Sequence, residues 1–257
     1  MSLNFITDEN FEKHIRETIE YYGDNLQSCN LNKFNANIID PIKLLFDKNV
    51  YGFSWEEIIK NEIFRQRDKS NTNIIGYFHQ NIFRYIANCT VPKTGWDIIF
   101  QKKSGIEFEG DKVGTVYVEM KNKHNTMNSA ASAKTYMKMQ GQLLSDDNCA
   151  CFLVEVIAKK SQNISWTISL DGHRQQHSRI RRVSIDKFYE IVTGEADAFY
   201  KMCMTLPDAI KRLIEGSDTL KIPKDTVFDE LKANATENSF ELALFMLGFA
   251  TYKGFAS

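Results

Sequence analysis

The chain has 257 residues, of which 43% are hydrophobic and 25% are charged, the composition of an ordinary folded protein. This length suits one large domain or two small ones. The 32 basic and 33 acidic residues nearly balance, so the net charge gives no support to nucleic-acid binding. It does not exclude such binding either, because local clusters of charge set the field that a ligand meets.

The cysteines and the N-terminus indicate where the protein works. The five cysteines are odd in number and form no CxxC pair, which predicts reduced thiols rather than a zinc site. Residues 1–10 lack the basic segment and apolar run of a secretory signal, and no apolar run approaches the length of a membrane span. We therefore expect a cytoplasmic protein with no membrane association.

The N-terminal third reads as helical. Thr7 followed by two acids begins a helix, Asp40-Pro41 begins a second, and the capping box Ser54-Trp55-Glu56-Glu57 begins a third. Together with apolar residues at helical spacing, these signals predict helices over 8–22, 41–46, 55–67 and 71–86.

After Asn88 the pattern changes to short apolar runs bounded by glycine. These runs predict strands over 96–102, 115–121, 151–157 and 165–170, with a helix over 125–144 between the second and the third. The helical period returns after Ile185, predicting helices over 185–192, 196–204, 208–214, 226–233 and 240–249.

This order predicts an α/β fold with a central mixed sheet flanked by helices. We expect one domain over 1–257. Its three parts are a helical N-terminal part (1–90), a catalytic sheet with a crossover helix (91–170), and a basic segment with a helical C-terminal part (171–257).

Three charged residues stand at the predicted strands in a pattern that suggests chemistry. Asp97 opens the first apolar run, and the second run ends in Glu119-Met120-Lys121. Because residues i and i+2 of a strand point to one face, Glu119 and Lys121 project together. If the two runs pair, Asp97 comes close to Glu119. Two carboxylates with an ammonium group can hold Mg²⁺ and act on a water molecule, and the alternative is a surface ion pair.

The strand context separates this pattern from a chance match. Glu230-Leu231-Lys232 has the same spacing, but it lies in a predicted helix, where residues i and i+2 diverge. Asp111 is a competing upstream acid, but Glu109-Gly110-Asp111-Lys112 is typical of a turn. We prefer Asp97, because a strand holds its carboxylate rigidly.

The pattern resembles the PD-(D/E)xK nuclease superfamily, in which an Asp on one strand precedes Glu-x-Lys on the next. The longer runs Gly95-Trp96-Asp97, 118–129 and 172–189 are similar to the type II restriction endonucleases that cleave GGNCC sites. The similarity covers most of the chain, up to Tyr252-Lys253-Gly254-Phe255. One departure is that Gly95-Trp96 replaces the proline before the aspartate, a proline without a chemical role.

The resemblance implies a restriction-endonuclease-like fold and a homodimeric, Mg²⁺-dependent enzyme of a restriction-modification system. Such an enzyme makes double-strand cuts in DNA with 5′ overhangs. Asp97 and Glu119 would carry over as metal ligands, and Lys121 as the residue that acts on the attacking water. An acid on an N-terminal helix assists some sites of this kind, and both Glu57 and Glu62 are candidates.

Two basic segments are candidates for DNA contact, because guanine offers acceptors that suit Arg and Lys. One is 121–125, which leaves the catalytic strand. The other is 173–182, with four arginines in ten residues, for which the alternative is a solvated turn between a strand and a helix. The expected DNA contacts are Lys123, Asn125, Asn128, Ser129, Arg174, Arg179 and Arg181.

Two functions follow. The leading hypothesis is a Mg²⁺-dependent, site-specific DNA endonuclease. The alternative is a non-catalytic nucleic-acid-binding module on the same fold, with the charged residues forming a surface ion-pair cluster. Only the endonuclease requires a metal, so removing Mg²⁺ separates the two.

Overall fold

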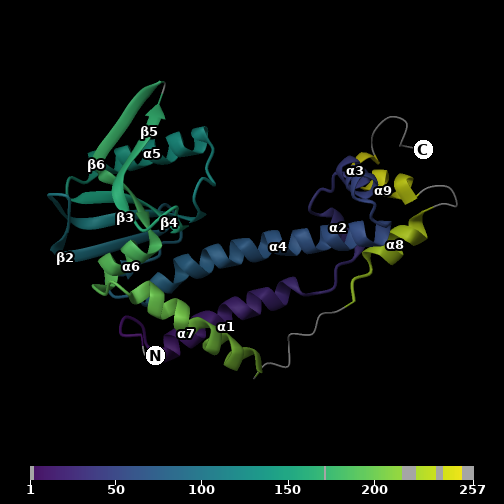
Figure 1. Cartoon of the computed structure of the whole chain (residues 1–257), viewed down its shortest axis with the longest axis horizontal. Helices are drawn as coiled ribbons and strands as arrows, with labels where there is room; N and C mark the ends of the chain where they lie inside the picture. Colours follow the sequence, from purple (N-terminus) through teal and green to yellow (C-terminus); the bar gives the residue numbers. More distant parts are fainter. Residues whose placement is uncertain (1–2, 171, 216–223, 236–239, 251–257) are drawn as a thin grey trace. The chain divides into compact units, whose positions relative to one another are not determined.

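The computed structural model describes residues 3–170, 172–215, 224–235 and 240–250. The chain forms two compact units, Met1–Ile19 with Ile75–Gly216, and Glu20–Ile74 with Ser217–Ser257 (Figure 1). Two helices, α1 (Asp8–Asn25) and α4 (Trp55–Asn81), contribute residues to both units. Whether the two units fold and work as one nuclease domain over 1–257, as the sequence predicts, stays a prediction.

The first unit, called the sheet unit here, contains a mixed sheet. In the described part of the chain this sheet has six strands in the order β1-β2-β3-β4-β6-β5. β3, β4 and β6 run parallel, and the other neighbours are antiparallel. The strands are β1 (Cys89–Thr90), β2 (Ile98–Phe108), β3 (Asp111–Lys123), β4 (Cys149–Ile157), β5 (Asn163–Leu170) and β6 (His173–Ser184).

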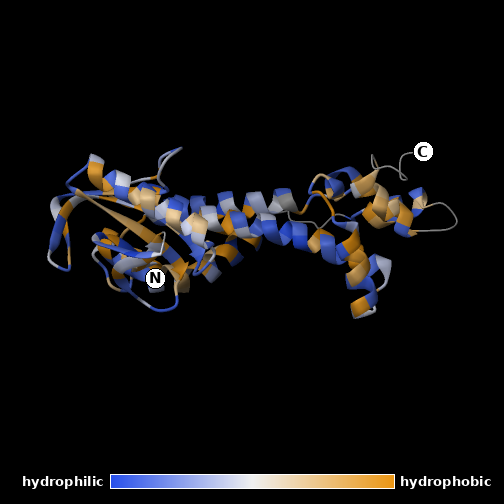
Figure 2. Ribbon diagram, turned by 90° about the horizontal axis from the view of Figure 1, so that it is seen from above, coloured by the Kyte–Doolittle hydropathy of each residue, from blue (hydrophilic) through white to orange (hydrophobic). Residues whose placement is uncertain are grey.

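Helices cover both faces of this sheet. Helix α5 (Ser129–Ser145) packs on one face through Tyr136, Met139 and Leu143. The other face packs against α1, the end of α4, α6 (Ile185–Thr193) and α7 (Ala198–Glu215). β4 is therefore buried on both sides. In Figure 2, hydrophobic segments run inside the sheet unit and hydrophilic segments lie at its edge. The predicted α/β architecture is confirmed.

The second unit is helical. It contains α2 (Leu31–Asn35), α3 (Pro41–Tyr51), α8 (Val227–Asn234), α9 (Phe240–Phe249) and the first part of α4. The predicted helices over 226–233 and 240–249 are thus confirmed, whereas residues 252–255 lie outside the described ranges. Its apolar core includes Phe34, Leu44, Ile59, Val227 and Leu244.

Local capping signals place the starts of α3 and α4 correctly. The Asp40 carboxylate accepts hydrogen bonds from the Ile42 and Lys43 N–H groups, so it caps α3. At the start of α4, the Ser54 N–H donates to the Glu57 carboxylate over 2.8 Å, and the Glu57 N–H donates to the Ser54 hydroxyl. This reciprocal pair is the predicted capping box.

Two predicted breaks between helices are wrong. The helices predicted over 55–67 and 71–86 form the single helix α4, followed by the 3-10 turn Ile82–Tyr85. Residues 65–73 contain no apolar side chain, so the apolar period vanishes there although the backbone stays helical. Likewise the helices predicted over 196–204 and 208–214 form the single helix α7, which continues through Pro207.

The strands predicted over 96–102 and 115–121 correspond to β2 and β3. Both are longer than predicted, and they meet in a tight hairpin. Only Glu109 and Gly110 separate them, with φ angles of 45° and 88°, the left-handed pair that a two-residue turn requires. Gly105, which lies between the strands predicted over 96–102 and 115–121, is inside β2, where the register shifts between Gln101 and Ile106. A glycine in a bulge and a glycine in a turn look the same in sequence.

The basic segment 173–182 is a strand, not a turn. It forms most of β6, which pairs with β5 on one side and with β4 on the other. In a strand, neighbouring arginines point to opposite faces. The basic cluster is therefore divided between the two sides of the sheet.

Candidate active site

Asp97 is fixed beside Glu119 by hydrogen bonds to the neighbouring strand. It directly precedes β2, and its N–H donates to the Val118 carbonyl over 3.0 Å. Its Oδ2 accepts the Met120 N–H over 2.7 Å, so the carboxylate lies against the residue that follows Glu119. Gln80, near the end of α4, donates to the Asp97 carbonyl over 3.2 Å. The structure thus brings Asp97 to β3, whereas Asp111 pairs with Phe108 at the hairpin turn.

Glu119 and Lys121 project from the same face of β3. Val118, before Glu119, and Met120, between Glu119 and Lys121, are buried in the core on the other face. Lys121 Nζ lies 3.7 Å from Glu119 Oε2, and the Glu119 side chain is 14% exposed while that of Lys121 is 33% exposed. The strand rule applied to Glu119-x-Lys121 therefore gives the correct geometry. Glu230 and Lys232 lie in helix α8, as expected for the chance match.

Asp97 lies in a partly buried position that disfavours its negative charge. Burial raises the pKa of Asp97 above its usual range, and the charge of Glu119 adds to this shift. The Met120 N–H and the ammonium groups of Lys121 and Lys138 act in the opposite direction. A desolvated carboxylate beside a second one binds a cation favourably, because the cation neutralises both.

Lys138, which the sequence did not single out, completes the charge balance. It projects from α5 and forms an ion pair with Glu119 Oε1, and it donates to the Gly95 carbonyl. Its ammonium group also lies 4.0 Å from the centre of the Trp96 ring, which Gln142 holds through the indole N–H. No rule of sequence spacing predicts a contact between a lysine in the middle of a helix, such as Lys138, and a glutamate on a strand, such as Glu119. Only the packing of α5 reveals this contact.

The donor set fits a magnesium ion better than a transition metal. Among the residues that the structure describes, no group of three or more His, Cys, Asp or Glu side chains surrounds a common point. Asp97 and Glu119 supply two carboxylates, and Asp97 Oδ1 has no hydrogen-bond partner among the described groups. Mg²⁺ accepts such a set, because it keeps several waters and completes its shell with substrate oxygens.

Four of the predicted DNA contacts lie where β3 leads into α5. Lys123 ends β3, and Asn125 is exposed with a positive φ of 56°, which asparagine tolerates. Asn128 caps α5, its Oδ1 accepting the Ala131 N–H over 2.8 Å, and exposed Ser129 begins the helix. These residues follow the Glu119–Lys121 strand directly, so they lie at the same end of the sheet.

Two arginines of β6, Arg174 and Arg179, lie elsewhere. β4 and β6 first pair at Cys151 and Ile180, and Arg174 precedes that pair by six residues, toward the end of the sheet away from Lys121. Arg179 donates to the Asp147 and Cys149 carbonyls at the start of β4. The structure therefore separates Arg174 and Arg179 from the three charged residues.

Arg181 is a correction to the predicted set. Its side chain is 1% exposed, on the face of the sheet opposite Glu119. Its guanidinium donates to the Asn163 side chain and carbonyl, to Glu109 and to the Ser178 carbonyl. With four of its five N–H groups bonded inside the protein and its side chain buried, Arg181 is not placed to contact DNA. The cluster looked like one surface only because the strand was not recognised.

Its neighbour Arg182 points the other way, toward the face that carries Lys121. There it meets Glu155 of β4 and His124, which follows β3. Sequence reasoning missed all three as a group. The alternation of a strand would have separated Arg182 from Arg181, but nothing in the sequence pairs it with Glu155.

The two candidate helper acids both have other partners. The Glu57 carboxylate serves the capping box at Ser54. Glu62 is buried, and its carboxylate accepts two hydrogen bonds from Arg65 and one from Gln66. Both acids belong to the helical unit. The structure gives each a structural role within that unit.

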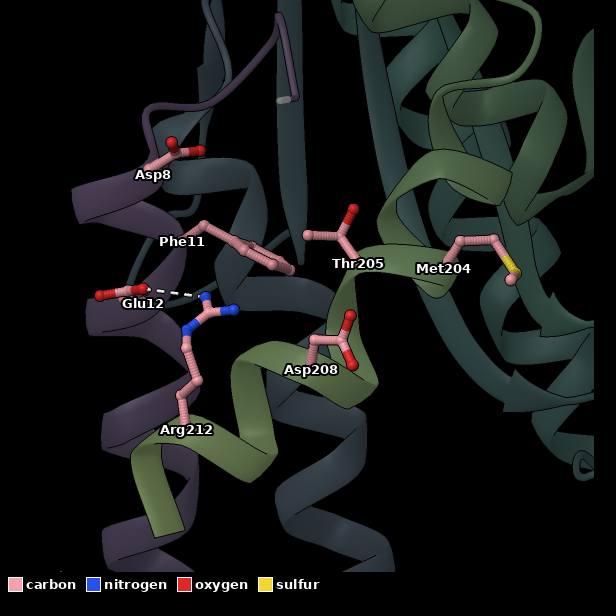
Figure 3. Close-up of a pocket in the computed structure, with 7 residues that line it drawn as sticks. All are labelled: Asp8, Phe11, Glu12, Met204, Thr205, Asp208 and Arg212. Atoms are coloured by element: carbon pink, nitrogen blue, oxygen red, sulfur yellow. Dashed lines mark hydrogen bonds and ion pairs between the residues drawn. The ribbon is translucent and has the colours of Figure 1, made fainter. Parts of the chain in front are cut away.

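A separate cavity of about 440 Å³ lies between α1 and α7 (Figure 3). Glu12 and Arg212 form an ion pair of 3.1 Å at its wall. Its lining residues are Asp8, Phe11, Glu12, Met204, Thr205, Asp208 and Arg212. It shares no residue with the Asp97–Glu119–Lys121 group.

Comparison with known proteins agrees with this geometry. The family model of the Eco47II restriction endonuclease matches residues 3–215. The type II restriction enzyme Sau96I of Staphylococcus aureus is 31% identical over 249 residues, covering 94% of this chain and 92% of the relative. The type II restriction enzyme Eco47II of Escherichia coli is 29% identical over 244 residues, with 88% and 95% coverage.

The described helices include none that is both long and apolar enough to cross a membrane. The family match spans the sheet, Asp97, Glu119 and Lys121, and it extends through most of the sheet unit and into the helical unit. The chain belongs to the Eco47II restriction endonuclease family.

Proposed function

We propose that this protein is a Mg²⁺-dependent type II restriction endonuclease that hydrolyses phosphodiester bonds in double-stranded DNA. The observation that supports this most directly is the contact of Asp97 with the Glu119-Met120-Lys121 strand, in a chain of the restriction endonuclease family. From the resemblance to GGNCC-cleaving enzymes we infer cutting at GGNCC with 5′ overhangs. The enzyme acts in the cytoplasm as the restriction half of a restriction-modification system.

Asp97 and Glu119 would hold the metal ion. When bound, Mg²⁺ supplies Lewis-acid polarisation of the scissile phosphate and a more acidic water. Lys121, held 3.7 Å from Glu119 on the same strand face, donates a hydrogen bond to the attacking water and stabilises its hydroxide form. Asp97 stays in place during this step, because the Met120 N–H and the β3 ladder fix it.

The enzyme works as a homodimer on DNA. A palindromic site offers two equivalent strands, and a two-fold symmetric protein presents one set of catalytic residues to each. Lys123, Asn125, Asn128 and Ser129 contact the DNA next to the cleaved bond. Arg174 and Arg179 contact it farther along, most readily at phosphates.

Digestion of plasmid DNA tests this proposal. We expect discrete fragments with Mg²⁺ and no cleavage in EDTA, because two carboxylates without a cation repel the phosphate. Sequencing the fragment ends should place every cut at GGNCC with a 5′ overhang. Random ends, or equal cutting in EDTA, would contradict the proposal. Binding without cleavage in Mg²⁺ would favour the non-catalytic alternative.

Replacing Lys138 with methionine should strengthen metal binding. The Lys138 ammonium occupies Glu119 Oε1, so a cation entering the site must displace it. We expect the dissociation constant of Mn²⁺, measured by electron paramagnetic resonance without DNA, to fall roughly two- to fivefold, the size of a partly exposed ion pair. Lys134→Met, at an exposed position one turn earlier on α5, serves as the control and should change nothing. Weaker Mn²⁺ binding by Lys138→Met would count against the role given to Glu119.

A further inference from the structure

A second charged group lies on the same sheet face as Lys121. Glu155 of β4 has a side chain only 2% exposed, yet it carries a carboxylate. His124 Nδ1 lies 3.0 and 3.1 Å from its two oxygens, and Arg182 Nη2 forms an ion pair with Oε1. The two basic side chains also touch each other, with 2.7 Å between Arg182 Nη2 and His124 Nδ1. One buried acid therefore holds two bases.

The strand register places this group next to the candidate active site. Lys121 of β3 pairs directly with Glu155 of β4, which pairs in turn with Ser184 of β6. Residues paired across neighbouring strands project to the same face, so Lys121 and Glu155 are side-by-side neighbours. His124 is three residues beyond Lys121, and its N–H donates to the Ile157 carbonyl at the end of β4. The group thus extends the catalytic face by one strand.

Both basic side chains retain nitrogens that no group of the described chain contacts. Arg182 Nη1 and Nε and the His124 Nε2 have no hydrogen-bond partner among the described groups, and Arg182 Nε is fully buried. The side chains of Arg182 and His124 are 21% and 15% exposed, so solvent reaches parts of both. Burial acts to raise the pKa of Glu155, but hydrogen bonds from Arg182 and His124 outweigh it and hold that pKa below its usual range. Glu155 therefore stays ionised and keeps both bases in place.

We propose that Arg182 and His124 form a binding site for a DNA phosphate adjacent to the phosphate that is cleaved. This inference rests on the proposed nuclease function. The guanidinium offers the charged N–H donors of Nη1 to a phosphodiester oxygen, while Glu155 holds Nη2 and so orients the group before DNA arrives. A phosphate suits the site better than a base, because the group stands level with Lys121, which acts at the sugar-phosphate backbone. Arg182 and His124 bind the substrate, and Glu155 is a positioning residue.

The alternative is an ion-pair group that only stabilises the sheet. Substitution alone does not separate the two, because loss of Arg182 also leaves Glu155 buried without its partner. The DNA can be altered instead. A methylphosphonate removes the charge of one chosen phosphate and leaves the protein unchanged.

The experiment is a methylphosphonate scan along a GGNCC duplex, with binding measured in Ca²⁺ for wild type, Arg182→Gln and His124→Asn. We expect each variant to bind the unmodified duplex about tenfold more weakly, the effect of a lost charge-assisted hydrogen bond. A neutral linkage at one position, next to the cleaved bond, should weaken wild-type binding by a similar factor. At that position alone, Arg182→Gln should bind the modified and unmodified duplexes equally well.

Arg16→Gln, an exposed arginine on α1, is the matched control and should leave the scan unchanged. The scan of the wild-type protein gives a result even if a variant fails to fold. If the wild type binds and cuts the duplex but no neutral position couples to Arg182, the phosphate site is overturned while the nuclease function stands. If the wild type neither binds nor cuts any duplex, the nuclease function fails first.

Discussion

Replacing Lys121 with alanine should lower the single-turnover rate of DNA cleavage by about 10²–10⁴-fold, the usual range for a residue that assists proton transfer. DNA binding in Ca²⁺ should remain close to that of the wild type. The reason is the position of the ammonium group, 3.7 Å from Glu119 on the same face of β3, the strand to which Asp97 is hydrogen-bonded. Asp97 and Glu119 remain in the variant, so the metal and the phosphate still bind, but the attacking water loses its donor.

The chain contains its own control for this experiment. Lys232 occupies the same local sequence, Glu-x-Lys, but it is exposed on helix α8. Lys232→Ala should cleave at the wild-type rate. Cleavage by Lys121→Ala at that rate would remove Lys121 from the mechanism. A loss of binding as large as the loss of cleavage would make Lys121 a residue for holding DNA rather than for chemistry.

Replacing Arg181 with alanine should lower the free energy of unfolding by roughly 3 kcal/mol, the sum expected for lost buried hydrogen bonds and a small cavity. The Arg181 guanidinium satisfies the Asn163 and Ser178 carbonyls inside the sheet unit. It also lies 5.0 Å from the ring of Phe108, so the substitution removes packing as well as charge. Its partner Glu109 is more than half exposed, so the ion pair itself contributes little.

Urea unfolding followed by circular dichroism measures this difference. Arg174→Ala, at an exposed position of the same strand, should change the free energy of unfolding by less than about 0.5 kcal/mol. Equal stability of the Arg181 and Arg174 variants would mean that the internal bonds of Arg181 add nothing to the fold. A selective loss of DNA affinity in Arg181→Ala, with stability intact, would restore Arg181 to the set of DNA contacts.

The geometry of the Asp97, Glu119 and Lys121 group was predictable because it depends on local sequence. The two-residue repeat of a strand places Glu119 and Lys121 on one face, and the strand ahead of them supplies Asp97. Capping signals were equally local, and Asp40 and Ser54 begin their helices as expected. Each of these inferences uses residues within a few positions of one another, where backbone geometry alone decides.

The parts that were wrong or missing depend on contacts between distant segments. The strand β6 looks polar in sequence because few of its own residues are apolar. Much of the apolar surface that it packs against comes from β4 and α5. Without that strand, Arg181 and Arg182 could not be assigned to opposite faces. Lys138 reaches Glu119 from a helix 19 residues later in the chain, a contact that no sequence period encodes.

The hydrogen bond from the Met120 N–H to Asp97 has one more consequence. The pairing of β2 with β3 ends at Ile98 and Val118, and beyond that point the Asp97 side chain takes over as acceptor for the sheet. Asp97 therefore belongs at once to the scaffold of the sheet and to the proposed metal site. Deleting its side chain would confound the two, whereas asparagine keeps an acceptor for Met120 and removes only the negative charge. In this fold Asp97→Asn, rather than Asp97→Ala, is the substitution that isolates the catalytic contribution of that charge.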